Sequence, residues 1–182
     1  NLVFFVKVDE EFGVLSSNSA DGMRRFVQTV ANCTTSSLAE GFDEHMRAVL
    51  LPSIYSGARD PSETVRRENL RVFGFLLTVM PDWEPVADLS GLLTDRQEDS
   101  SEPSFFFNIL SPATARQLEA LNALQSANES KEMSSQNLGQ FFIPLLEHFV
   151  YGRADGGDDH GLGAQATTTI GSLALSLHWN HW

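Results

Sequence analysis

A cluster of residue types that bind metals occurs in the stretch DDHGLG, where Asp158, Asp159 and His160 are adjacent. A catalytic metal needs about three ligands in fixed geometry, usually contributed by several elements of the fold. Adjacent residues in a glycine-rich loop do not provide that arrangement. We therefore expect a turn between two helices and no metal, and we keep a helical hydrolase that uses these three residues only as a remote alternative.

Other reactive side chains also lack the spacing that chemistry requires. His178 and His181 in HWNHW do not form the i, i+4 pair of a helical zinc motif, and we expect Trp179 between them to pack into the fold. Cys33 has no CxxC partner and no evident neighbouring base, which predicts an inert thiol. The glycines of GLGAQATTTIG do not follow a strand, so a phosphate-binding loop is not expected. The sequence predicts no enzyme, cofactor or small-molecule substrate.

Basic residues are concentrated in a single stretch, VRRENLR, which contains Arg66, Arg67 and Arg71. Together with Arg116 these are the candidate contacts to RNA or to a partner protein. The alternative is a solvated helix face, because Glu63 and Arg67 have the i, i+4 spacing of a helix-stabilising ion pair.

Composition limits the classes of function. The chain has 182 residues, 42% of them hydrophobic, and its 24 acidic and 12 basic residues give a formal charge of −12. Nucleic-acid affinity depends largely on basic groups that displace counterions from phosphates, so this chain is expected to bind RNA poorly by itself and to suit basic proteins better. No apolar run reaches the roughly 18 residues of a membrane span. The apolar start at Asn1 suggests a fragment or a processed chain.

Apolar residues recur at helical rather than strand-like spacing, which predicts an all-α fold. Only residues 1–14 are ambiguous between helix and strand. Asp60, Ser111 and Ser135 are the expected caps of three of the helices. The helices are expected at residues 20–31, 39–56, 60–80, 111–127, 135–152 and 161–179. The predicted core of the last two consists of Phe142, Leu145, Leu146, Phe149, Ile170, Leu173, Leu177 and Trp179.

Two helix pairs in the sequence are alike, which predicts a helical repeat. Each pair has a proline in its first helix, then a tyrosine and a glycine, an aspartate-containing turn, and a second helix followed by a tryptophan. The corresponding residues are Pro52 and Pro144, Tyr55 and Tyr151, Gly74 and Gly171, and Trp83 and Trp179. The tyrosines and the tryptophans are about 96 positions apart, or roughly two HEAT-type units of 40–47 residues. We therefore expect a HEAT- or armadillo-like α-solenoid fragment.

The expected organisation has four parts. Residues 1–59 form helical repeats that the sequence places poorly, and residues 60–92 form HEAT-like helices. Residues 93–104 form an acidic, serine-rich loop in which Ser100 or Ser101 is a candidate phosphate acceptor, with a flexible loop as the simpler interpretation. Residues 105–182 form further HEAT-like repeats.

The order of motifs in residues 98–182 resembles the down-regulated-in-metastasis family, the very large HEAT-repeat, U3 snoRNP-associated subunit of the small-subunit processome. The resemblance lies in an acidic lead, a paired phenylalanine with asparagine, a proline–leucine helix and a later helix that ends in tryptophan. The matching residues are Phe106, Phe107, Asn108, Ile109, Pro144, Leu145, Phe149, Thr169, Ile170, Gly171, Leu177 and Trp179. The family usually has a basic run after the asparagine. The corresponding stretch here, SPATARQLEAL, has Arg116 as its only basic residue.

The resemblance implies a non-catalytic scaffold in the nucleolus that acts in pre-ribosomal RNA processing and small ribosomal subunit assembly. Its partners would be processome proteins and the pre-ribosomal RNP (the 90S pre-ribosome), without a membrane or a cofactor. The missing basic run leaves direct RNA contact by this segment open. An unrelated HEAT-repeat adaptor, such as a transport receptor for basic protein ligands, is the alternative.

Overall fold

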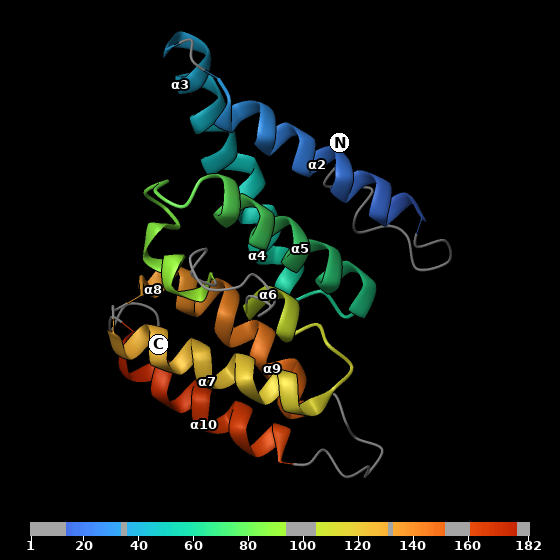
Figure 1. The fold of residues 1–182 in the computed structure, drawn as a ribbon, viewed down its shortest axis with the longest axis vertical. Helices are drawn as coiled ribbons and strands as arrows, with labels where there is room; N and C mark the ends of the chain where they lie inside the picture. Colours follow the sequence, from blue (N-terminus) through green and yellow to red (C-terminus); the bar gives the residue numbers. More distant parts are fainter. Residues whose placement is uncertain (1–13, 34–35, 94–104, 131–132, 152–160, 178–182) are drawn as a thin grey trace, which may run out of the picture. The chain divides into compact units, whose positions relative to one another are not determined.

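The computed structural model describes residues 14–33, 36–93, 105–130, 133–151 and 161–177. Within these ranges every regular element is helical, which confirms the predicted all-α class (Figure 1). The chain divides into two compact units, Asn1–Pro85 and Val86–Trp182. The four-part organisation expected from the sequence stays a prediction, and so does the solenoid.

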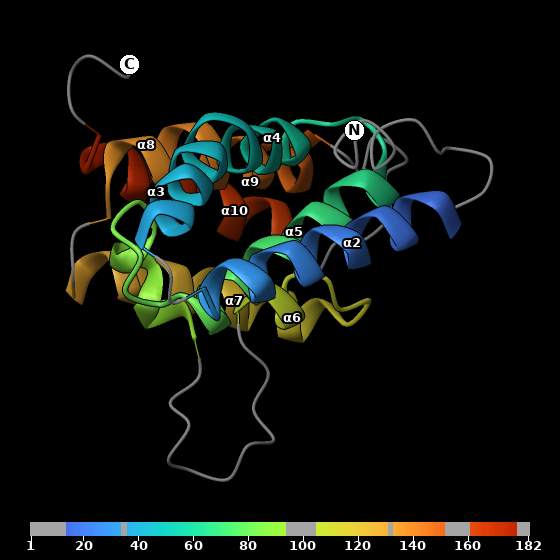
Figure 2. The ribbon, with the colours of Figure 1, turned by 90° about the horizontal axis from the view of Figure 1, so that it is seen from above.

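The described residues of the first unit form three long helical stretches. The middle stretch is continuous and consists of α3, a π-helical turn η1, and α4. The last helix, α5, packs against both α2 and α4 (Figure 2). The bounds are α2 Val14–Ala31, α3 Ser36–His45, η1 Met46–Leu50, α4 Leu51–Ala58 and α5 Glu63–Val79.

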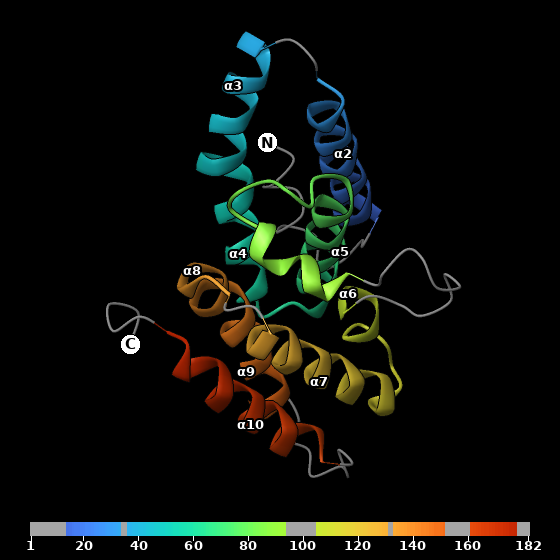
Figure 3. The same cartoon turned by 60° about the vertical axis from the view of Figure 1, so that its left-hand side comes forward.

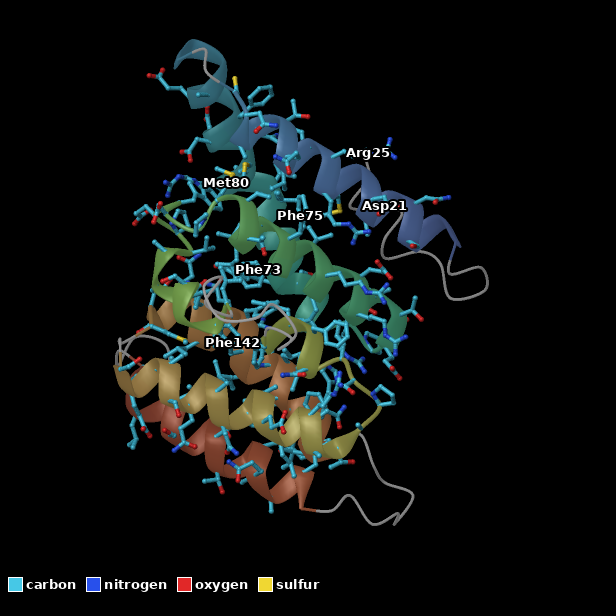
Figure 4. The ribbon with its side chains drawn as sticks, in the orientation of Figure 1. Asp21, Arg25, Phe73, Phe75, Met80 and Phe142 are labelled. Carbon is cyan, nitrogen blue, oxygen red and sulfur yellow. The ribbon has the colours of Figure 1, made fainter. Side chains whose placement is uncertain are left out.

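The core of the first unit lies where α5 meets its two neighbours. Phe73 is fully buried, and its ring meets that of Tyr55 edge to face at 6.1 Å (Figure 4). Phe26 of α2 makes similar contacts with Phe42 and His45, which hold α3 against α2. Apolar residues on one broad face of α5 are all buried, namely Val65, Leu70, Phe73, Leu76 and Leu77.

The second unit repeats this arrangement of helices. Its middle stretch is again continuous, with a π-helical turn η3 between α8 and α9, and its last helix α10 packs against α7 and α9 (Figure 3). The bounds are η2 Ala87–Leu92 (a 3₁₀ helix), α6 Phe105–Asn108, α7 Thr114–Ser130, α8 Ser135–Asn137, η3 Leu138–Phe142, α9 Ile143–Tyr151 and α10 Leu162–Leu175.

Phenylalanine rings form the centre of the second unit. Phe142 is fully buried and contacts Phe105 and Phe141 edge to face, with ring centroids 5.6 and 5.1 Å apart. Because Phe105 belongs to α6 and Phe142 to η3, their contact fixes α6 to η3 although α6 is only four residues long. Within α6, Phe105 also meets Phe106 at 5.2 Å. Edge-to-face pairs of this kind add about 0.5–1.5 kcal/mol each to the burial of apolar area.

Each of the two middle helices contains a π-helical turn directly before its proline. The backbone N–H of Leu51 donates to the carbonyl of Met46, and that of Ile143 donates to the carbonyl of Leu138, both five residues back. Pro52 and Pro144 follow at the next positions. Proline lacks an N–H and clashes with the carbonyl four residues before it, and a widened turn relieves both problems. Both prolines are therefore accommodated by a π turn inside a continuous helix.

Three helices begin later or earlier than their predicted caps. Asp60 lies three residues before α5, and its carboxylate accepts a hydrogen bond from the Ser62 N–H at 2.9 Å instead of capping the helix. Ser111 likewise accepts from the Ala113 N–H, three residues before α7 begins. The cap of α8 is Ser134, whose hydroxyl accepts from the Asn137 N–H, and not Ser135. In all three cases the residue at which the helix begins depends on the geometry of the preceding loop, which the spacing of apolar residues does not indicate.

The predicted core residues of the second unit differ in exposure. Phe142, Leu145, Leu146 and Leu173 are buried, and Phe149, Ile170 and Leu177 are half-buried. Trp179 lies outside the described residues. The tyrosines that suggested the repeat are not equivalent in structure, because Tyr55 is 3% exposed and Tyr151 is 77% exposed. The two prolines, with their π turns, are the equivalent positions, and they are 92 rather than 96 residues apart.

Candidate interaction surfaces

The three candidate arginines of α5 are held by their own chain. The Arg66 guanidinium donates to the carbonyl oxygens of Asp60 and Pro61, each at 2.7 Å, and closes the turn that leads into α5. Burial of this guanidinium lowers the pKa of Arg66, which nearby carboxylates partly offset. Arg66 therefore has a structural task at the start of the helix.

Arg67 and Arg71 pair with glutamates on the same helix. Arg67 binds Glu63 and Arg71 binds Glu68, each with a nitrogen–oxygen distance of 2.8 Å. The predicted i, i+4 pair is thus present. Glu68 is buried, and its second carboxylate oxygen has no hydrogen-bond partner among the described residues. The basic patch is locally neutralised, which reduces its attraction for phosphate.

Arg116 has a different neighbour. Its guanidinium lies 6.0 Å from the ring centroid of Phe107, at the outer limit of a cation–π contact. Phe107 is 59% exposed, whereas the two phenylalanines before it are buried. Of the residues that carry the family resemblance, Phe107 therefore presents an aromatic surface to solvent.

A cluster that the sequence did not indicate joins the start of the middle helix of the first unit to the loop after α5. The Asp43 carboxylate accepts from the Trp83 indole N–H at 2.6 Å and from Arg47 at 2.7 Å. Arg47 also binds Glu84 at 2.8 Å, and its guanidinium lies 5.4 Å from the centroid of the Trp83 ring. We call Asp43, Arg47, Trp83 and Glu84 the tryptophan cluster.

The tryptophan cluster shifts the ionisation of its charged members. The hydrogen bond from Trp83, followed by that from Arg47, holds the pKa of Asp43 below its ordinary value of 3.8. Hydrogen bonds to Glu84 and Asp43 raise the pKa of Arg47. Asp43 and Arg47 lie 37 to 40 residues before the partners that they bind after α5, so no local pattern could reveal the contacts between the two pairs. The one available signal was Trp83 at the end of a helix.

Beside this cluster, one side of α3 and η1 forms a shallow groove. It is lined by Ala39, Glu40, Asp43, Glu44, Arg47 and Ala48. Two alanines, three carboxylates and one arginine make up this lining, and we call the two exposed glutamates, Glu40 and Glu44, its rim. We call these six residues the α3 groove.

The residues first considered for metal chemistry, Asp158, Asp159 and His160, lie outside the described residues, as do His178, His181, Ser100 and Ser101. In the described part of the chain no group of three or more histidine, cysteine, aspartate or glutamate side chains is arranged to hold a metal. Among the described helices, none has both the length and the apolar character needed to cross a membrane.

Fold and surfaces together define an all-helical protein of two similarly built helical units with an acidic surface groove. A family described as "U3 small nucleolar RNA-associated protein 20, N-terminal" matches residues 1–62. The protein named "U3 small nucleolar RNA-associated protein 20" from Schizosaccharomyces pombe is 26% identical over 182 residues, which is 100% of this chain and 7% of that protein. Its namesake from Saccharomyces cerevisiae is 24% identical over 178 residues, covering 98% of this chain and 7% of its own length.

These matches confirm the resemblance to the down-regulated-in-metastasis family. They also extend it from residues 98–182 to the whole chain, including the first 59 residues that no sequence motif had placed. The chain spans about 7% of the length of the curated relatives.

Proposed function

We propose that this chain is a non-catalytic scaffold segment of the small-subunit processome, acting in nucleolar pre-ribosomal RNA processing and small ribosomal subunit assembly. Similarity over the entire chain to relatives named for association with U3 small nucleolar RNA is the observation that supports the proposal most strongly. The two helical units also support it, because stacked helical units provide extended surfaces that bind several partners at once.

Affinity purification of the full-length protein tests this function. We expect the purified material to contain early small-subunit precursors, processome proteins and U3 RNA, with a spliceosomal RNA and an untagged strain as controls. If the purified material contains no more precursors or U3 RNA than these controls, the proposal is contradicted. Nucleolar localisation of the tagged protein is a second expected outcome, and exclusion from the nucleolus would count against it.

A second candidate function is a helical adaptor, such as a transport receptor, that binds basic protein ligands. The α3 groove favours this candidate because its rim is rich in carboxylates. The same purification separates the two functions. Recovery of cargo proteins with basic localisation signals, in place of ribosomal precursors, would support the adaptor.

We propose that the four candidate arginines differ in how readily they can contact RNA or a partner protein. Arg66, Arg67 and Arg71 have local partners, so contacts through them to RNA or protein would have to replace existing interactions. Arg116, which lies against the exposed Phe107, is the better placed of the four for contact with another molecule.

A further inference from the structure

The α3 groove lies on the side of the helix that faces away from α2. Phe42 packs against Phe26 of α2, and Glu40 and Glu44 lie two residues before and after it. Two residues correspond to about 200° around a helix, so both glutamates lie on the opposite side from this packed face. Both are exposed. On this side of α3, Asp43 and Arg47 hold Trp83 and Glu84, whereas Glu40 and Glu44 beside them remain accessible to a partner.

The charge on the groove is strongly negative. Glu40 and Glu44 make no hydrogen bond or ion pair with any described residue. The cation in the groove, Arg47, is bound by Asp43 and Glu84 and stacked on Trp83, so it does not offset the free glutamates. A ligand at this groove therefore meets uncompensated carboxylates.

Small side chains at both ends of the groove suit close approach by another helix. Ala39 lies at one end and Ala48 at the other, with the charged residues between them along the chain. Val49, on the same π turn as Ala48, is 41% exposed and adds apolar surface next to it. Apolar surface beside charged side chains is typical of protein-binding surfaces, and ridges of one helix pack into the grooves of another.

We propose that the α3 groove binds a basic amphipathic helix of a partner protein, with small or aliphatic side chains against Ala39 and Ala48 and lysine or arginine against the glutamate rim. This partner class rests on the proposed scaffold function. Charge complementarity selects a basic protein segment and not RNA, because phosphates would be repelled by Glu40 and Glu44. In the tryptophan cluster, Arg47 is bound by Asp43 and Glu84, so its guanidinium does not neutralise the free carboxylates Glu40 and Glu44.

Titration of the purified chain with defined probes tests the proposal. The probe is a labelled helical peptide of about 18 residues, roughly five turns, with alanine and leucine on one face and lysine at the flanks. Matched probes replace lysine by glutamate or consist of single-stranded polyuridine RNA. We expect only the lysine peptide to bind, with affinity that falls as salt is raised.

The decisive variant reverses both rim charges, Glu40→Lys with Glu44→Lys. We expect about tenfold weaker binding of the lysine peptide, since two exposed ion pairs become repulsive. The matched control, Glu119→Lys with Glu147→Lys, changes the net charge equally at exposed positions of α7 and α9. We expect this control variant to bind the lysine peptide less than about twofold more weakly, because salt screens charges that lie far from the groove.

Equal weakening in both double variants would overturn the proposal, because net charge alone would then explain binding. Failure of the unaltered chain to bind the lysine peptide, or tighter binding of RNA, would also overturn it. If the reversed variant loses helicity by circular dichroism, Glu40→Gln with Glu44→Gln replaces it. That variant should still weaken binding several-fold, and unchanged affinity would reject the groove.

The outcomes distinguish this groove from the proposed function. Suppose that the full-length protein recovers small-subunit precursors, but the groove variant and the control variant bind the peptide equally. That combination rejects the groove proposal and leaves the scaffold function standing. A full-length protein that recovers no precursors rejects the scaffold function, whatever the peptide shows.

Discussion

At Gly57 the backbone of α4 comes so close to α5 that a methyl group has no room. A Cβ atom there would overlap the side chain of Asn69, which is itself buried and donates to the Val65 carbonyl at 2.8 Å. Asn69 cannot move aside without losing that hydrogen bond. Glycine at this position is therefore required by packing, and not by an unusual backbone angle.

We predict that Gly57→Ala destabilises the chain by about 1–3 kcal/mol, the usual result of overpacking a core. Urea unfolding followed by circular dichroism provides the measurement. The matched control is Gly41→Ala in α3, where a Cβ meets nothing within 4 Å. Because alanine is the better helix former, the control should gain about 0.5–1 kcal/mol. Similar effects at the two glycines would contradict the packing account.

Asp43 provides a pH-dependent prediction at the same scale. Its pKa is lower in the folded chain than in the unfolded chain, so its charged form favours folding. This contribution is fully present above the unfolded aspartate pKa near 3.8 and is lost as the pH falls through the lower folded value.

Replacement of the donor, Trp83→Phe, should therefore cost stability at neutral pH and less in acid. Since Asp43 is partly exposed, we expect only about 0.5–1 kcal/mol at about pH 7, shrinking towards about pH 3. Urea unfolding at both pH values measures this difference. A cost that is the same at both would show that Trp83 acts through ring packing and not through Asp43.

At the scale of elements, short segments are tied to the helices that follow them. Asp88 at the start of η2 accepts from the Ser134 N–H at 2.6 Å and from the buried Asn137 amide at 2.9 and 3.1 Å. One carboxylate thus fixes the first turn of α8 to η2. Phenylalanine rings do the same for α6, which would be too short to be stable alone.

The η3–α9 stretch should lose very different amounts of stability at its two phenylalanines. Phe142→Ala removes a fully buried ring in contact with Phe105 and Phe141, with an expected cost of about 3–5 kcal/mol. Phe149→Ala removes a half-buried ring and should cost about 1–2 kcal/mol. Thermal or urea unfolding of the whole chain measures both. An unchanged stability for Phe149→Ala would show that its ring contributes nothing to packing.

At the scale of the whole molecule, net charge dominates the expected behaviour towards RNA. The chain has a formal charge of −12. Arg67 and Arg71 are paired with glutamates of α5, and Arg66 is bound to the turn before that helix. Attraction to phosphates needs unpaired basic groups that release counterions. The described part of the chain offers few such groups.

We accordingly predict no salt-dependent binding of the isolated chain to single-stranded RNA at physiological ionic strength. Filter binding or fluorescence anisotropy across a salt series tests it. Affinity that falls linearly with the logarithm of salt concentration would reveal several phosphate contacts and refute the prediction. Arg116→Ala would then be the first variant to test, with Arg25→Ala, another exposed arginine, as control.

Much of the fold follows from local pattern. Helical spacing of apolar residues predicted the all-α class. The i, i+4 spacing of Glu63 and Arg67 also predicted the ion pair that they form. These features depend on interactions within one or two turns of helix, so residues close in sequence are enough to specify them.

Tertiary structure alone decided the rest. Identical tyrosines of the two similar helix pairs differ because α5 covers Tyr55, whereas Tyr151 at the end of α9 is exposed. The arginines that suggested a binding patch have partners on their own helix or turn, and the tryptophan cluster joins residues about 40 positions apart. The α3 groove exists because Phe42 sets which side of α3 is packed. Helical periodicity identifies an apolar face, but only contacts between distant segments determine which surface is left for a partner.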